Sequence, residues 1–476
     1  MPTPCLAPHR RIAVIGGGIT GLAAAHRLLE LDSRLEIALL ESGPRLGGIL
    51  QTIHQDGYLI ERSADMFTTR EPWGLDLCRR LGIEAELIET NQRHRRAFVA
   101  HRGKLVPVPE GFTLMSPAKI GPILSTPLLS LRGKLRLACE YFTPAAKNGG
   151  DESLQSFAVR RFGREVFERL VQPLIGGIYT ADPAVLSMQA TMPQFVAMER
   201  QHGSLIRAAR AAKPAKEKPT ASLGSGARYG MFLAPRIGMQ QLVDALAAKL
   251  PTNCIQLNCP VERMERREGW EVTLPGGLPP EKFDAVILAT PAPIAARLLA
   301  STDPGLASNV GSIPQAGCTV AVLGYRREQI AHPLDGFGFV VPAVEKRRIF
   351  AGSFSSVKFE GRAPPGKVLL RIFLGGALQP EMGQLPDVET RRLVQEELAE
   401  LLGVQGPPEF CQVIRWHGAM PQYHVGHLEL AAKIAAAVAN IPGLAVAGNS
   451  FHGVGVPYCI HDGEQAAERL LGQQPG

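Results

Sequence analysis

The sequence has few of the features that mark secreted, metal-binding or membrane-spanning proteins. Eight cysteines are scattered along 476 residues without a Cys-x-x-Cys pair, which is typical of reduced thiols in a reducing compartment. No run of about 20 apolar residues occurs, so we expect no transmembrane helix. The start of the chain, MPTPCLAPHRRIAVIGGG, lacks the apolar segment of a signal peptide. We therefore expect a cytoplasmic protein.

Signatures of nucleic-acid recognition and of metal binding are absent as well. The chain has no zinc-ligand spacing or other metal cluster, no RRM-type aromatic motif and no long basic helix. Its formal net charge is nevertheless +7. A basic balance favours an anionic partner. An anionic small molecule and an anionic membrane surface both remain open.

A β-α-β unit begins the chain. Ile12–Ile15 is an apolar run that ends in glycines and predicts a buried parallel strand. Thr20–Leu31 has helical periodicity with an alanine-rich face, and Glu36–Glu41 predicts a second strand.

A glycine-rich motif, Gly16-Gly17-Gly18-Ile19-Thr20-Gly21, joins the first strand to the helix and fits the dinucleotide-binding fingerprint. Gly16 permits the tight turn, Gly18 lets the backbone approach a pyrophosphate, and Gly21 permits close packing of helix on strand. The helix N-terminus offers free N–H groups to the phosphates. Glu41 ends the second strand, where a ribose hydroxyl is accepted. The order strand, helix, strand and acid is far more specific than the glycines alone.

A second motif, Glu41-Ser42-Gly43-Pro44-Arg45-Leu46-Gly47-Gly48, follows directly. Together the two motifs resemble the extended fingerprint of the glutathione-reductase-type flavoproteins. In that superfamily the acid binds the adenosine ribose, while the later Arg and Gly-Gly approach the pyrophosphate and the flavin. The resemblance favours FAD over NAD and implies an α/β fold with a FAD-binding Rossmann domain.

The C-terminal half carries other elements of such a fold. Phe283–Pro291 (FDAVILATP) matches the strand that returns to the FAD domain in this superfamily. Leu444–Ala447 predicts a strand, a glycine-rich loop runs to Val456, and a helix is expected over Gly463–Leu471. Such a helix N-terminus stabilises negative charge on the flavin. No second glycine fingerprint followed by an acid occurs, which argues against a separate NAD(P)H domain.

The remaining segments predict a second, mainly antiparallel sheet and a helical insertion. The sheet is expected from strand-like segments with turn signals at Cys318–Tyr325, Gly338–Val341, Arg347–Phe354 and Val368–Phe373. We divide the chain into a FAD-binding domain in three parts (1–90, 233–300 and 441–476), a helical, substrate and candidate membrane-contact insertion (91–212), a flexible Lys/Pro/Ser/Gly-rich loop (213–232) and a substrate-domain sheet (301–440).

The middle of the chain narrows the choice of flavoenzyme. Several segments resemble the bacterial type of the protoporphyrinogen/coproporphyrinogen oxidase family, in order and over nearly the whole chain: Gly57–Thr69, Arg102–Gly111, Arg161–Asp182, Leu186–Glu199, His202–Ile206, Arg236–Leu242, Asp335–Pro342 and Gly443–Cys459. The resemblance implies FAD-dependent, six-electron oxidation of a porphyrinogen to a porphyrin in haem biosynthesis, with O2 as acceptor and H2O2 as product. Bacterial relatives often take coproporphyrinogen III, which we favour over protoporphyrinogen IX.

The resemblance also implies the residues that bind FAD. They are Gly16, Gly17, Gly18, Ile19, Thr20, Gly21, Glu41, Ser42, Arg45, Gly47, Gly48, Arg62, Ser63, Ala64, Asp65, Val261, Trp416, Gly448, Asn449, Val454, Gly455 and Val456.

No residue is assigned as a catalytic base, because His452 and His461 are more typical of structural histidines. Cys459 lacks the sequence context of a covalently bound flavin.

A porphyrinogen is an apolar macrocycle with carboxylates at its rim, so its site needs an apolar slot and a few cations. Arg95, Arg96 and Lys104 are candidates, and Arg96 is preferred because it lies just before an apolar strand. The stretch Ile120–Phe142 is apolar and basic and is a candidate surface for peripheral contact with an anionic membrane.

Two other classes of protein remain open. One is another flavin oxidase of the same fold, such as an amine oxidase or a phytoene desaturase. The other is a non-catalytic binding protein of the GDP-dissociation-inhibitor type, which uses this fold without FAD. The Gly47-Gly48 segment and the C-terminal loop argue against the second class.

Overall fold

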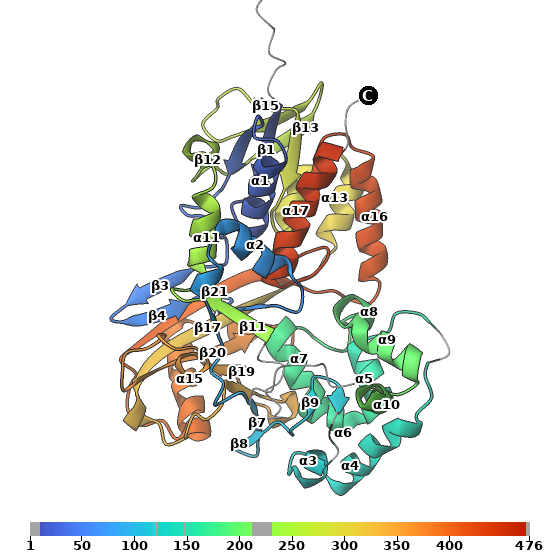
Figure 1. Ribbon diagram of the computed structural model, residues 1–476, viewed down its shortest axis with the longest axis vertical. Helices are drawn as coiled ribbons and strands as arrows, with labels where there is room; N and C mark the ends of the chain where they lie inside the picture. Colours follow the sequence, from blue (N-terminus) through green and yellow to red (C-terminus); the bar gives the residue numbers. More distant parts are fainter. Residues whose placement is uncertain (1–9, 118, 120, 147–148, 212–230, 473–476) are drawn as a thin grey trace, which may run out of the picture.

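The computed structural model describes residues 10–117, 119, 121–146, 149–211 and 231–472 (Figure 1). Nearly all of the loop predicted at 213–232 lies outside the described residues. In Figure 1 a parallel sheet with its helices occupies the upper part of the molecule, a large second sheet the lower left, and a helical region the lower right. The predicted α/β class, with a Rossmann-type sheet and a second sheet, is confirmed.

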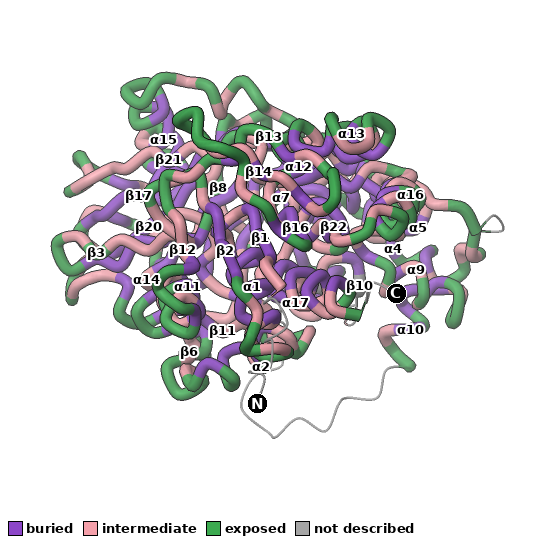
Figure 2. Tube along the Cα trace, turned by 90° about the horizontal axis from the view of Figure 1, so that it is seen from above, coloured by how far each residue is buried: buried purple, intermediate pink, exposed green. Residues whose placement is uncertain are grey.

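A five-stranded parallel sheet forms the upper part. Its strand order is β12-β2-β1-β16-β22, and the bounds are β1 Arg11–Ile15, β2 Glu36–Leu40, β12 Ile255–Gln256, β16 Ala285–Leu288 and β22 Leu444–Val446. Alternate residues of β1 pack into different cores, since Ile12 and Val14 contact one cluster while Ala13 and Ile15 contact the other. Both faces are therefore covered, which explains why these strands are continuous apolar runs (Figure 2).

Helices from distant parts of the chain cover the two faces of this sheet. One face carries α1 Ile19–Leu31, α2 Trp73–Leu81, α11 Gln240–Ala247 and α17 Val456–Gly472. The other carries α12 Ala292–Leu299, α13 Pro304–Gly311, α16 His427–Ala439 and a small antiparallel sheet of β13 Arg263–Arg266, β14 Trp270–Thr273 and β15 Glu281–Phe283. The alanines of α1 are buried because α17 lies directly against them.

The second sheet has seven strands and is mainly antiparallel, as predicted. Its order is β21-β17-β20-β19-β18-β7-β8, with bounds β7 Phe98–His101, β8 Lys104–Pro107, β17 Gln315–Arg326, β18 Gly338–Val340, β19 Ala351–Phe354, β20 Lys367–Gly375 and β21 Phe410–Pro421. The strands β18 and β7 pair in parallel. The segment expected as Arg347–Phe354 is a strand only from Ala351. β21 was not predicted, because polar residues interrupt its apolar pattern. The helix α15 Asp387–Leu402 packs against one face of this sheet.

The helical region contains α3 Gly121–Ser125, α4 Leu131–Ala138, α5 Leu154–Phe162, α6 Arg164–Val166, a π-helical turn Phe167–Val171, α7 Gln172–Tyr179, α8 Met188–Thr191, α9 Pro193–His202 and α10 Leu205–Ala211. A buried ionic network holds it together. Glu140 forms an ion pair with Arg161 and accepts hydrogen bonds from Ser204 Oγ (2.6 Å) and from the N–H groups of Leu205 (2.8 Å) and Ile206 (3.1 Å). The carboxylate therefore caps the N-terminus of α10.

The last helix corrects one expectation. Its first residue is Val456 rather than Gly463, so it begins about two turns earlier. Gly463 lies within the helix, where a Cβ atom would be 2.3 Å from the carbonyl oxygen of Thr20 in α1. The glycine permits two helices to approach closely and does not mark a helix start.

Replacing Gly463 by Ala tests this packing. We expect Gly463→Ala to lower the free energy of unfolding by about 2 kcal/mol, because the added methyl forces α17 away from α1 and this cost exceeds the gain in helix propensity. Gly472→Ala is the matched control, since Gly472 ends the same helix and nothing lies within 4 Å of its Cβ position. Denaturant unfolding of both variants provides the measurement, and equal stabilities would contradict the packing role.

Glu61 has a buried carboxyl group at the junction of the two sheets. Glu61 ends β4 (Tyr58–Glu61), which pairs with β3 (Thr52–Gln55). Its Oε1 accepts from the N–H of Met239 (2.7 Å) and its Oε2 from Thr52 Oγ1 (2.8 Å). Burial raises the pKa of Glu61 to about 7. The folded protein therefore binds a proton that the unfolded chain loses above about pH 4.5.

Because the folded-state pKa of Glu61 is raised, the stability linked to its protonation is complete at low pH and is lost as the pH rises towards 7. Glu61→Gln keeps an acceptor oxygen and cannot ionise. We therefore expect its free energy of unfolding, minus that of the parent protein, to be up to about 3 kcal/mol larger at pH 8 than at pH 5. Glu360→Gln, at an exposed position, is the control. A stability difference between parent and Glu61→Gln that does not change between pH 5 and 8 would refute this reading.

Candidate functional site

The glycines in the loop after β1 are required at their positions for different steric reasons. Gly16 has φ +110°, and a Cβ there would be 2.5 Å from the carbonyl oxygen of Ala289. A Cβ on Gly21 would be 1.9 Å from the carbonyl oxygen of Gly16, which confirms the close packing of helix on strand. Gly18 precedes α1, and nothing lies within 4 Å of its Cβ position. The loop is therefore closed on the strand side and open at Gly18, where Ile19 and Thr20 start the helix.

The second motif lies against the first. The N–H of Gly47 donates to the carbonyl of Gly17 (2.8 Å), and Gly18 and Gly47 form an isolated bridge. The Arg45 guanidinium donates to backbone carbonyls of the same turn, including that of Leu50 (2.9 Å). Burial and the nearby charge of Arg62 lower the pKa of Arg45. These contacts bring the two glycine segments to the same edge of the parallel sheet.

The side chain of Glu41 connects the two glycine segments by hydrogen bonds. Its Oε2 accepts from the N–H of Gly17 (2.7 Å) and its Oε1 from the N–H of Gly43 (2.7 Å), with Ser42 Oγ at 3.3 Å. The carbonyl of Glu41 accepts from the N–H of Cys259 (2.8 Å), so the segment that leads to buried Val261 runs alongside.

The segment 62–65 lies between the two sheets and is held from the larger one. Trp416 Nε1 on β21 donates to the carbonyl of Arg62 (2.8 Å), and Arg371 on β20 donates to that of Ser63. The Asp65 carboxylate forms ion pairs with Lys358 Nζ (2.6 Å) and Arg371 (3.2 Å). Sequence reasoning missed these two cations, although an arginine within the apolar run KVLLRIFLG was a signal.

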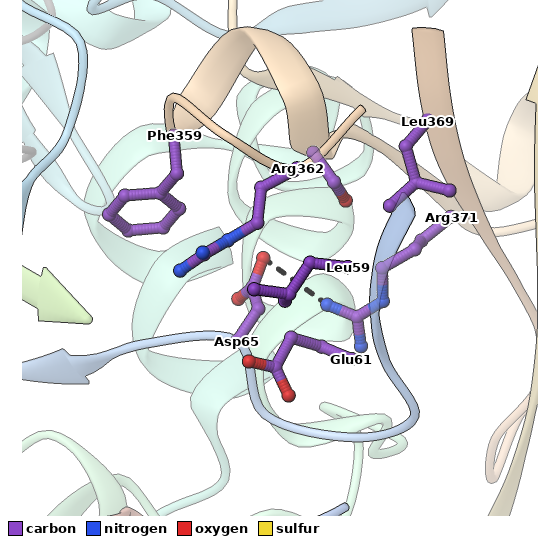
Figure 3. A pocket seen from close by; sticks show the side chains of 8 residues that line it. Leu59, Glu61, Asp65, Phe359, Arg362, Leu369 and Arg371 are labelled. Atoms are coloured by element: carbon purple, nitrogen blue, oxygen red, sulfur yellow. Dashed lines mark ion pairs between the residues drawn. The ribbon is translucent and has the colours of Figure 1, made fainter. Parts of the chain in front are cut away.

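A water-sized internal cavity lies beside Asp65, and Figure 3 shows its lining. Two carboxylates, Glu61 and Asp65, and two guanidinium groups, Arg362 and Arg371, line it together with apolar side chains. Burial raises the pKa of Asp65, but Lys358 and Arg371 outweigh it and bring the pKa to about 2. Asp65 is therefore fully ionised at neutral pH, whereas Glu61, with a pKa of about 7, is only partly ionised.

The C-terminal loop is fixed by two buried polar side chains that sequence reasoning did not single out. Asp462 on α17 accepts from the N–H of Gly448 (2.7 Å), which has φ +138°. Tyr423 Oη donates to the carbonyl of Asn449 (2.5 Å) and accepts from the N–H of Gly453 (2.7 Å). The remaining predicted residues of this loop lead into α17: Val454, which packs on the helical core, and Gly455 and Val456.

One strand connects this loop to the 62–65 segment. On β21, Trp416 holds Arg62, while the carbonyl of Ala419 accepts from Asn449 Nδ2 (3.2 Å). Gln51, just after the second motif, accepts from Arg62 through its side chain (2.7 Å). The structure therefore brings the predicted cofactor segments into one continuous region at the carboxyl edge of the parallel sheet.

The residues of this region fit a bound flavin nucleotide. Among the buried polar side-chain atoms of the described residues that lack a hydrogen-bond partner, Arg62 Nε, Ser63 Oγ and Thr290 Oγ1 lie in this region, the last beside Gly16. Buried polar atoms of this kind need a partner from outside the chain. The open space at Gly18, at the N-terminus of α1, is suited to a phosphate.

The predicted substrate cations lie elsewhere. Arg96 forms an ion pair with Asp335 and donates a hydrogen bond to the Asp335 carbonyl (2.6 Å). Arg96 lies just before β7, which is far from β21 in the strand order of the second sheet. Arg95 contacts Glu89 (3.3 Å). Lys104 is exposed on β8. None of these contacts tests a role in substrate binding.

The nucleophilic and basic side chains near the loop are engaged in the fold. His452 pairs with Asp462 (3.0 Å), and His461 stacks on Trp73 with ring centroids 3.9 Å apart. Burial raises the pKa of the Cys459 thiol to about 12, so it is a poor nucleophile. We assign no catalytic base from these groups.

Comparisons with known proteins give a consistent result. The chain matches the family described as flavin containing amine oxidoreductase over residues 19–471. It is 34% identical to a coproporphyrinogen III oxidase of Bacillus subtilis, covering 97% of this chain and 98% of the relative. It is 28% identical to a mitochondrial protoporphyrinogen oxidase of Nicotiana tabacum, covering 97% and 95%.

A solved structure of a candidate protoporphyrinogen oxidase from Exiguobacterium sp. 255-15 superposes with a TM-score of 0.86 at 28% identity, covering 98% of this chain and 99% of that one. Sequence and structure thus agree over the full length. The chain belongs to the flavin containing amine oxidoreductase family and, within it, to the group of oxygen-dependent porphyrinogen oxidases.

Proposed function

We propose that this protein is a FAD-dependent coproporphyrinogen III oxidase of haem biosynthesis. It removes six electrons and six protons from the porphyrinogen, and three O2 molecules leave as three H2O2. The full-length similarity to a bacterial coproporphyrinogen III oxidase carries this proposal. Oxidation of protoporphyrinogen IX is the alternative, supported by the weaker similarity to a plant enzyme.

The cofactor assignment rests on residues that fit FAD. The N–H groups around Gly18 and the N-terminus of α1 would hold the pyrophosphate, and Glu41 would accept a ribose hydroxyl after exchanging one of its loop amides. The segments at Gly47–Gly48, 62–65 and 448–456 would surround the isoalloxazine. When bound, FAD supplies the hydride-accepting chemistry and the reaction with O2. The chain's own residues orient the cofactor and the macrocycle.

The competing classes explain these features less well. A binding protein without FAD would leave Arg62 Nε, Ser63 Oγ and Thr290 Oγ1, buried at this edge of the sheet, without a partner. An amine oxidase or a desaturase of the same fold remains compatible with the cofactor segments. The similarity to porphyrinogen oxidases over nearly the whole chain favours a porphyrinogen as the substrate.

The anchor for the propionates is a separate proposal. Arg96 would have to exchange its ion pair with Asp335 for a propionate, and its side chain is about 41% exposed, which makes this exchange accessible. The role of Arg96 stays a prediction.

A comparison of two substrates under air tests the proposed reaction. The purified holoprotein should be yellow, with flavin absorption bands. Porphyrin fluorescence should rise with coproporphyrinogen III at a kcat/KM at least about tenfold above that with protoporphyrinogen IX, a preference worth about 1.4 kcal/mol. No rise with either porphyrinogen would refute the oxidase assignment, while a preference for protoporphyrinogen IX would refute only the substrate choice.

We propose, in addition, that the helical region contacts an anionic membrane surface. Leu131 and Leu135 lie one turn apart on the same side of α4 and are 84% and 68% exposed, and Phe142 beyond them is 78% exposed. Arg132 and Lys134 lie between the two leucines in the sequence, and neither forms an ion pair with another described residue. Arg136 instead donates to the carbonyls of Arg160 and Arg161.

Exposed apolar side chains next to unpaired cations are the combination by which interfacial helices bind anionic lipids. This surface of α4 lies at the tip of the helical region, far from the parallel sheet (Figure 1). Ile120, the first residue of the predicted stretch, lies outside the described residues. Among the described helices, none is long and apolar enough to cross a bilayer.

Vesicle flotation tests this surface. The protein should float with phosphatidylglycerol-containing vesicles and not with pure phosphatidylcholine, and binding should weaken as salt is raised. The double variant Leu131→Ser/Leu135→Ser should bind about tenfold more weakly. Leu278→Ser, at an equally exposed leucine between β14 and β15, should bind like the parent protein. Absence of flotation with anionic vesicles would contradict the proposal.

A further inference from the structure

The backbone of the 62–65 segment is oriented by donors on the large sheet. Trp416 Nε1 reaches the carbonyl of Arg62 at 2.8 Å, and the Arg371 guanidinium reaches the next carbonyl, that of Ser63. The donors lie on β21 and β20, which both pair with β17. Two successive carbonyls are therefore turned towards the second sheet.

A buried ion pair reinforces this orientation at the next turn of the chain. Asp65 is held by Lys358 and by the second terminal nitrogen of Arg371, at 2.6 and 3.2 Å. All three side chains are nearly or fully buried. Because an unpaired buried charge is costly, this pair leaves the carboxylate few alternative positions. Arg371 thus binds both the backbone and the side chain of the segment.

The orientation of the carbonyls determines where the following N–H groups point. In a planar trans peptide the C=O and the next N–H are antiparallel. The N–H group of Ser63 therefore points away from Trp416, and that of Ala64 points away from the Arg371 nitrogen that binds Ser63. Within the described residues no group accepts a hydrogen bond from either one, although both residues are partly buried.

Half-buried backbone donors without a partner are uncommon. The Arg62 Nε and Ser63 Oγ atoms beside them are buried and unpartnered as well. A ligand that satisfies this group must present hydrogen-bond acceptors along one edge. The ring nitrogens and carbonyl oxygens of an isoalloxazine meet that requirement.

We propose that Arg371, assisted by Trp416, is a positioning residue of the oxidation site. It sets the orientation of the Ser63 and Ala64 N–H groups and thereby couples the substrate-domain sheet to the flavin ring. This inference rests on the proposed function, since it requires FAD in the site. It predicts that substitutions far from the glycine loop change the flavin environment and kcat, and leave substrate affinity nearly unchanged.

The test uses two conservative variants, each with a matched control, in the FAD-loaded enzyme. Arg371→Lys keeps a positive charge beside Asp65 and removes the second N–H group that reaches Ser63. Its control is Arg362→Lys, because Arg362 lines the same cavity and donates instead to the carbonyls of Pro235 (3.0 Å) and Arg236 (2.6 Å).

The second variant, Trp416→Phe, removes one donor and keeps a large aromatic ring. Its control is Trp270→Phe, since the buried Trp270 donates to the carbonyl of Pro442 (3.3 Å) in the FAD domain and does not touch the 62–65 segment. This variant keeps the proposal testable if Arg371→Lys fails to fold.

The visible circular dichroism of the bound flavin, kcat and KM for the porphyrinogen are measured for all four variants. We expect Arg371→Lys and Trp416→Phe to alter the dichroism and to lower kcat about tenfold, with KM within about twofold of the parent value, because small misplacements of a reacting group have effects of this size. Both controls should retain the parent spectrum and kcat.

Test variants that match their controls in spectrum and kcat would overturn the positioning role. A rise in KM with unchanged kcat and dichroism would also overturn it, since it would indicate a contact with substrate. A parent protein without flavin bands or porphyrinogen oxidation would instead refute the proposed function, a result that the parent measurements alone reveal.

Discussion

The loop after β1, the helix α1 and the helix α17 approach one another so closely that only glycine fits at their contacts. Gly21 lets α1 lie on the Gly16 carbonyl, and Gly463 lets α17 lie on the Thr20 carbonyl from the other side. Any Cβ at either glycine would be within 2.3 Å of backbone oxygen. The helix α1 is thus packed between β1 and α17. This packing places the first glycine loop and the C-terminal loop at one edge of the parallel sheet.

The second sheet contributes to the same edge through polar contacts. Trp416 and Arg371 extend from its strands to the carbonyls of the 62–65 segment, and Ala419 binds the side chain of Asn449. The two buried carboxyl groups at this junction differ in pKa because their partners differ. Asp65 faces two close cations, while Glu61 accepts mainly from neutral donors and is dominated by burial. These polar contacts join the second sheet to the segments at the edge of the first.

Local patterns predicted those elements whose apolar period matches their burial. The run Ile12–Ile15 is buried on both faces, and Cys318–Tyr325 lies within β17, so both were recognisable as strands. The strand β21 was missed because its side chains are mostly half-buried and mixed in polarity. The start of α17 was misplaced because a glycine was interpreted as a helix boundary, whereas tertiary packing requires it inside the helix.

The class of the fold, the glycine loop with its acid, and the resemblance to porphyrinogen oxidases could be predicted before the structure, because they depend on residues that are close together in the chain. The side chains that meet across the two sheets could not be predicted in this way. Lys358 and Arg371 are about 300 residues from the segment they hold, and Tyr423 reaches a loop in another part of the chain. Such pairs follow from the packing of sheets and helices, which no local pattern records.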